Sequence, residues 1–205
     1  MPHVTASALA SVLAECEKEG VPETHQRWHL AESAKQEIAA RSAYGPLLVD
    51  TDVVAKTGET KPILTVNPLT YIQAAFGQGG SFTELVMDSL RRHPSTHDSP
   101  WHFVIYSDEV VPGNPLEGQN LRKVWALYGS FQEFGQITLS HEEAWLVMNV
   151  SRSSEVALID AGVSQVMAAV LKLFFANSNC DVTNGGLVLK HPKGDLVRIL
   201  IVTGM

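Results

Sequence analysis

Asp108 is the side chain in this sequence that is best placed for metal-dependent chemistry. It follows an apolar run at positions 101–107 that is typical of a buried strand, so its carboxylate would stand at the strand end. Two or three carboxylates at neighbouring strand ends can hold divalent metal ions that activate water for attack on a phosphodiester. One carboxylate alone binds Mg²⁺ weakly, because the ion keeps most of its water shell unless several ligands converge. A metal site at Asp108 therefore requires further acids close to it.

Histidines form two other groups that could hold a metal ion. His25 and His29 lie four residues apart on an expected helix, so they could share one face, but no third ligand accompanies them. His93, His97 and His102 surround a polar segment bounded by prolines. Neither group has cysteine partners at zinc spacing, so we interpret both as solvent-facing polar residues.

A glycine-rich segment at residues 77–80 precedes an expected helix, as phosphate-binding loops do. It lacks the Lys-Ser/Thr pair of a P-loop and the glycine spacing of a dinucleotide fold, which favours a flexible turn between two helices. No G-x-S-x-G motif is present, and Ser130 falls inside an expected strand, so a hydrolase nucleophile is not indicated.

The elements that would position Asp108 lie in the second half of the chain. Apolar runs predict three consecutive strands, then a helix with an apolar stripe, then two more strands. Their ranges are 101–107, 123–134 and 144–150 for the first strands, 155–176 for the helix, and 187–190 and 196–203 for the last strands. Three strands with short links form an antiparallel meander, and a strand reached through a helix is usually parallel to its neighbour.

The first half has a mainly helical pattern. Helices are expected at 5–19, 24–42, 68–76 and 81–92, and two short apolar runs at 47–49 and 63–66 could form a hairpin. Ser81 and Glu84 have the spacing of a capping box at the start of the last of these helices. A polar, Pro-bounded linker at 93–100 predicts a boundary, with a helical region at 1–94 and a second domain at 95–205.

Three short motifs around Asp108 carry a resemblance to a known family. They are Ser107-Asp108-Glu109, the turn Asn114-Pro115-Leu116, and the segment from Lys123 to Phe134 with Ala126, Tyr128 and Ser130. In this order they resemble a block of transposase-derived proteins of eukaryotic mobile elements, which have a DDE-type, ribonuclease H-like fold. The likeness extends over residues 95–205, and only the combination of motifs is specific. The resemblance implies an α/β fold with a partial ribonuclease H-like mixed sheet after a helical N-terminal half.

The resemblance also implies a role for Asp108. In that family it would be the first catalytic acid and a ligand of Mg²⁺, and DNA would be the partner. The second acid of the family should follow the strand at 196–203, and the sequence given stops at Met205, so we expect a C-terminally truncated or relic protein that is inactive by itself. The structural alternative for Asp108 is a polar residue at a strand end. The alternative function is a non-catalytic globular interaction protein without nucleic-acid chemistry.

Composition and charge limit these hypotheses further. The chain has 205 residues and a net charge of −7, and neither half is basic, which counts against strong independent binding of DNA. The two cysteines are expected to be reduced thiols, and the start of the chain does not have the pattern of a signal peptide. We therefore expect an intracellular protein of the cytoplasm or nucleus, not a secreted or membrane protein. A strand left exposed at the sheet edge would promote self-association.

Overall fold

The computed structural model describes residues 41–111, 123–141, 144–177 and 180–203, and residues 39–205 belong to one compact unit. The helix expected at 5–19, and most of the one expected at 24–42, lie outside the described residues. The C-terminal end of the helix predicted at 24–42 is wrong, because β1 (Arg41–Ser42) pairs with β2 (Gly45–Pro46). The Ser42 hydroxyl accepts the backbone N–H of Tyr44, and Gly45 adopts a φ of 110°, so a tight turn replaces a helical one.

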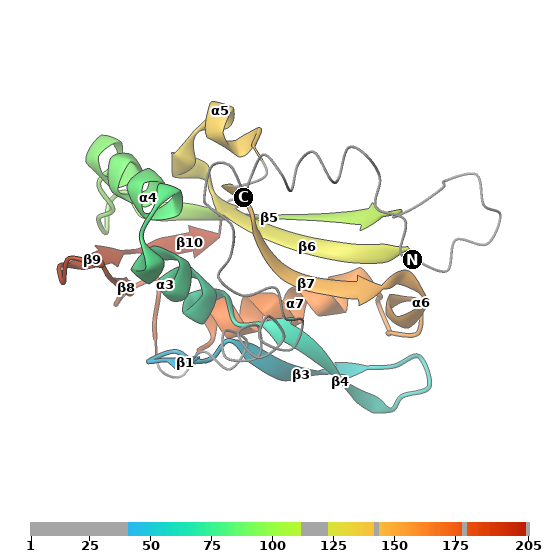
Figure 1. Ribbon diagram of the computed structural model, residues 1–205. Helices are drawn as coiled ribbons and strands as arrows, with labels where there is room; N and C mark the ends of the chain where they lie inside the picture. The colour runs from blue at the N-terminus through green and yellow to red at the C-terminus, as the bar shows by residue number, and fades with distance from the viewer. Residues whose placement is uncertain (1–40, 112–122, 142–143, 178–179, 204–205) are drawn as a thin grey trace, which may run out of the picture. The chain divides into compact units, whose positions relative to one another are not determined.

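The largest sheet of the described residues is four-stranded and mixed, and it is called the central sheet below (Figure 1). Its strand order is β10-β5-β6-β7. β6 is antiparallel to both of its neighbours, β5 and β7, and β10 is parallel to β5. The strands are β5 (Trp101–Val110), β6 (Val124–Phe131), β7 (Leu146–Arg152) and β10 (Ile201–Thr203). The expected α/β class with a mixed sheet is confirmed, whereas the ribonuclease H-like arrangement stays a prediction.

The single helix expected at 155–176 is two helices, α6 (Ser153–Val156) and α7 (Val163–Phe175). Between them the chain turns back to the edge of another strand, where Ile159 forms a β-bridge with Ala55. Ala161 and Gly162 then take positive φ angles of 56° and 55°. The apolar stripe at helical spacing could not reveal this break, because Ile159 is buried in the bridge as it would be in a helix.

The strand expected at 196–203 is also divided. β9 (Leu196–Ile199) pairs with β8 (Leu187–Lys190) in a separate hairpin, and the chain then enters β10 of the central sheet. Leu200 is the single residue between the two strands. Its backbone N–H donates to the Ser95 hydroxyl at 2.8 Å, and its carbonyl accepts the backbone N–H of Trp101 at 2.8 Å.

The described part of the first half has a hairpin and two helices. The hairpin is confirmed as β3 (Leu48–Val54) and β4 (Thr60–Val66), and the helices are α3 (Pro68–Gln78) and α4 (Ser81–Arg92). Asn67 caps α3 by accepting two backbone N–H groups. The capping box predicted at Ser81 is wrong, because Gly80 holds the cap position and Ser81 is already helical.

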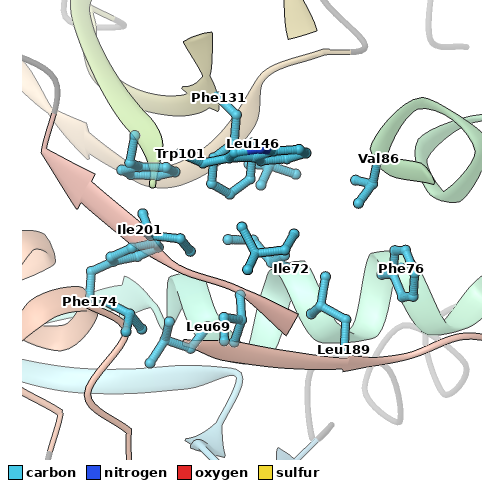
Figure 2. Close-up of a cluster of buried hydrophobic side chains, with 14 of the residues drawn as sticks. Leu69, Ile72, Phe76, Val86, Trp101, Phe131, Leu146, Phe174, Leu189 and Ile201 are labelled. Atoms are coloured by element: carbon cyan, nitrogen blue, oxygen red, sulfur yellow. The ribbon is translucent and has the colours of Figure 1, made fainter. Parts of the chain in front are cut away.

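One face of the central sheet is packed against α3 and α7 to form the core (Figure 2). The Phe174 ring of α7 stacks on Phe103 of β5, with ring centroids 4.3 Å apart. Leu69 and Ile72 of α3 are fully buried in the same cluster as Trp101. One continuous core therefore contains residues from both sides of the boundary expected between residues 94 and 95. The short helices η1 (Gln132–Phe134) and α5 (Gln136–Leu139) follow β6.

Candidate functional site

Asp108 lies in β5, opposite Ala126 of β6. Successive residues of a strand point to opposite faces, so Asp108 shares a face with Tyr106 and Val110, whereas Trp101 and Phe103 point into the core. Asp108 is exposed, and Tyr106 beside it is 55% exposed. The carboxylate therefore stands on the face of the sheet opposite to α3 and α7.

Apolar residues surround Asp108 across the strands. Ala126 lies directly opposite, and Val150 of β7 lies opposite Ala126. Within the residues that the structure describes, no three His, Cys, Asp or Glu side chains come together as a metal site. A Mg²⁺ ion needs several oxygen ligands, so Asp108 and its described neighbours do not fit the metal that the family resemblance implies.

The parallel strand β10 meets β5 far from Asp108. Its last described residue, Thr203, lies opposite Phe103, and Asp108 is five residues further along β5. At a rise of roughly 3.3 Å per residue this separates the end of β10 from Asp108 by about 16 Å. An acid placed immediately at the end of β10 would therefore not reach a metal ion held by Asp108.

Glu109, the next residue, points to the opposite face of the sheet. Lys123 Nζ lies 3.3 Å from its carboxylate, and the Ser153 side chain lies beside it. The proximity of the Ser153 hydroxyl, together with the hydrogen bond and the charge of Lys123, lowers the pKa of Glu109. The recorded ion pair of Glu109 is with Lys123, so it connects β5 to the residue directly before β6.

His102 and Glu133 form the second polar group on the sheet. The His102 Nδ1 atom lies 2.8 Å from Glu133 Oε1, and both carboxylate oxygens accept the His102 backbone N–H at 3.0 Å. The Glu133 side chain is 12% exposed and that of His102 is 45% exposed. The arrangement fixes the orientation of the imidazole, and it anchors η1 to the start of β5.

The sequence did not reveal this His–Glu pair, because Glu133 falls within a segment predicted to be strand and lies in η1 instead. The three-histidine group expected around the linker does not form a metal site in the described residues. His93 uses its backbone carbonyl to accept the Trp101 indole N–H at 2.8 Å. His25 and His29 lie outside the described residues, and so does the Asn-Pro-Leu turn.

The predicted turn between α3 and α4 is confirmed for Gly79 and Gly80, whereas Gly77 and Gln78 are the last residues of α3. Gly79 and Gly80 take φ angles of 85° and 77°, which residues with a side chain rarely adopt. The groove beside this turn is lined by side chains of both signs, including Glu84, Lys193 and Asp195.

Three aromatic rings mark the exposed face of the meander. Tyr106 stacks on Tyr128 with centroids 6.5 Å apart, and it meets Trp145 edge-on at 6.3 Å. Val150 is 58% exposed and Val147 is 37% exposed on β7. The side of the sheet that carries Asp108 is therefore a mainly apolar surface.

Comparison of the chain with protein-family models, with curated proteins and with solved structures found no match. None of the helices in the described ranges has the length and apolar character needed to cross a membrane.

Proposed function

We propose that this chain is a transposase-derived protein with a ribonuclease H-like fold that does not itself cut or join DNA. The observation that carries the fold part is the connectivity of the central sheet. A three-stranded meander leads through α7, and then through the β8–β9 hairpin, to a strand that lies parallel to β5. Apart from the hairpin, this is the order that the family resemblance implies.

The position of Asp108 supports the absence of catalysis. Two-metal phosphodiester chemistry needs convergent carboxylates, and in the described part of the chain Asp108 belongs to no group of three or more possible metal ligands. The net charge of −7 also argues against strong binding to a polyanion. Asp108 is thus the counterpart of a metal ligand in the parent family and, in this chain, a solvated strand residue.

A non-catalytic interaction protein is the second candidate function. The observation that favours it is the surface formed by Tyr106, Tyr128, Trp145 and the exposed valines of β7. Contiguous exposed apolar surface is typical of interaction sites. This candidate is compatible with the first, because an inactive nuclease fold can persist as a binding module.

The experiment is a Mn²⁺ titration followed by NMR, since paramagnetic broadening reveals residues close to a bound ion. We expect no selective broadening at Asp108, and no cleavage of supercoiled plasmid with Mg²⁺ or Mn²⁺. The Asp108→Asn variant should behave like the parent chain, and Asp195→Asn is the matched control for an exposed acid.

Metal-dependent cleavage that is lost in Asp108→Asn but kept in Asp195→Asn would overturn the absence of catalysis. The fold part is tested independently in the same spectra. Nuclear Overhauser effects between Trp101 and the Ile201–Val202 pair should be present, and their absence would remove the support for the parallel strand.

A further inference from the structure

Among the residues that the structure describes, β3 pairs with β4 on one edge, and its outer edge has backbone groups without a strand partner. At one end of the hairpin Ala55 N–H donates to Glu59 O, and at the other Asn67 N–H donates to Leu47 O. Hydrogen-bonded and non-hydrogen-bonded pairs alternate along an antiparallel ladder. These two bonds therefore fix which residues of β3 are hydrogen-bonded to β4 and which direct their backbone groups outward. The N–H and C=O groups of Leu48, Asp50 and Asp52 therefore point away from β4, and no described residue bonds to them.

At the end of β3 near Val54, the same outer edge already bonds to another segment of the chain. The Val54 N–H donates to the side-chain carbonyl of Gln165, and the Val54 carbonyl accepts the backbone N–H of Asp160. Lys56 N–H then donates to Leu158 O. A short segment of the chain thus adds to the edge beyond Val54, which shows that the edge accepts a further strand and defines where a groove would end.

A cavity of about 470 Å³ lies beside the open part of this edge, between β3 and α7. Its lining includes Asp52 and Val54 from β3 and Ala168, Lys172, Leu173 and Ala176 from α7. From Gln165 to Ala176 the helix rises by roughly 16 Å, which is the length of about five residues in a strand. The small side chain of Ala168 leaves room for an added strand next to the helix.

The two sides of an added strand would meet different surroundings. Val53 packs against Val166 of α7, so side chains on the Thr51 and Val53 side of the sheet face the helix. Asp50 and Asp52 alternate with these residues and are exposed, with Asp52 also lining the cavity, and Asp160 lies at the end of the groove. The α7 side of the cavity carries Ala168, Leu173 and the cation Lys172, so apolar residues suit that side of an added strand and cations suit the side of the two aspartates. A second copy of β3 would place aspartates against aspartates, which disfavours self-pairing.

We propose that the edge of β3 and the outer side of α7 bind an extended basic peptide of another protein, which adds to the hairpin as an antiparallel third strand. Main-chain bonds to Asp50 and Asp52 hold the peptide, as in other complexes formed by strand addition. Its alternate apolar side chains enter the cavity along α7, and the intervening Lys or Arg side chains face the two aspartates.

The experiment uses a fluorescein-labelled, end-blocked heptapeptide of alternating Lys and Val, and fluorescence anisotropy with the full chain. A peptide of the same composition with its three valines consecutive is the control for attraction to a protein of net charge −7. We expect the alternating peptide to bind at least tenfold more tightly than this control.

N-methylation separates strand addition from charge attraction. In an antiparallel third strand the lysine amides face β3 and the valine amides face away from it. N-methyl groups on the lysines should weaken binding by roughly tenfold or more, which is about 1.4 kcal/mol, whereas N-methyl groups on the valines should have little effect. Equal effects of the two sets, or no effect of either, would overturn the proposal.

Variants of the protein test the two walls of the groove. Ala168→Trp should fill the cavity and weaken binding at least tenfold, with Gln136→Trp on α5 as a matched control at another exposed helical position. Replacing Asp50 and Asp52 together by Asn should weaken it by about threefold to tenfold, as expected for two exposed ion pairs. If Ala168→Trp binds the peptide as tightly as the parent chain, the peptide binds elsewhere and the proposal is wrong. If no peptide binds and the chain instead forms a dimer that Ala168→Trp disrupts, the edge pairs with a second copy and the proposal is also wrong.

Discussion

Tyr44 connects the start of the described chain to the hairpin β8–β9, and its removal gives a sharp test of the fold. Its hydroxyl donates to the Val188 carbonyl at 3.0 Å and accepts the Val188 N–H at 2.9 Å. The phenol thus takes the place of a neighbouring strand for one residue of β8. Tyr44 is only 8% exposed, so its ring is also part of the core.

The Tyr44→Phe variant keeps the ring and leaves two backbone groups of Val188 without their partner. An unsatisfied buried donor or acceptor costs roughly 1–3 kcal/mol, and because the bonds to Val188 are only partly buried the lower end applies. We therefore expect a loss of about 2 kcal/mol in the free energy of unfolding, and at roughly 2–4 °C per kcal/mol a fall in Tm of about 4–8 °C.

Urea unfolding followed by tryptophan fluorescence measures this loss, since Trp101 is buried in the core. Tyr106→Phe is the matched control, because Tyr106 is mostly exposed and no hydrogen bond of its hydroxyl is found in the described structure; its effect should stay within about 0.5 kcal/mol. Equal stability of Tyr44→Phe and the parent chain would refute the reasoning.

Alkaline pH gives an independent readout of the same contact. Burial raises the pKa of Tyr44, an effect that the nearby Cys180 reinforces and the bond with Val188 partly opposes. The folded state thus favours the neutral phenol, so this contribution to stability is complete below about pH 10 and is lost as the pH rises through the folded pKa. Tyr44→Phe should lack that alkaline loss.

Two further predictions concern the central sheet. A methyl group at Gly129 would overlap the side chains of Phe103 and Met148, so Gly129→Ala should destabilise the fold by about 1–3 kcal/mol in urea unfolding, and an unchanged midpoint would contradict this packing. The pKa of Glu109 is lowered by Ser153 and Lys123, so its contribution to stability is present above the unfolded pKa of about 4.3 and is lost as the pH falls through the lower folded pKa. Glu109→Gln should therefore unfold with a weaker acid dependence than the parent chain, and identical acid profiles would contradict it.

Local patterns predicted the central elements well, because their apolar residues are consecutive or alternate in the sequence. The run at 101–107 is a strand with Trp101 and Phe103 buried, and the apolar stripe of α7 packs on the sheet. The sequence did not predict that Asn67, the buried residue directly before α3, caps that helix. Ser81 has the composition of a capping box but lies one position too late, because Gly80 supplies the non-helical backbone.

Features that depend on distant pairing could not be predicted from local sequence. The break at Ile159 exists because the edge of β3 bonds to residues 158–160, a contact between segments about 100 residues apart. The division at Leu200 arises because β9 and β10 join different sheets. The sequence placed Asp108 in the first strand of the meander, but only the register shows that its face of the sheet is apolar and that β10 meets β5 far from it.

The single residue between β9 and β10 has a consequence for the order of folding. Pairing Ile201 directly with Trp101 from an unfolded chain closes a long loop, which is entropically costly and slows folding. The β8–β9 hairpin is local in sequence and can form early, and it leaves Ile201 only two residues beyond Ile199. Once Tyr44 and α3 hold this hairpin against the core, the last strand has little freedom left to search, so its arrival completes the sheet in a late and cooperative step.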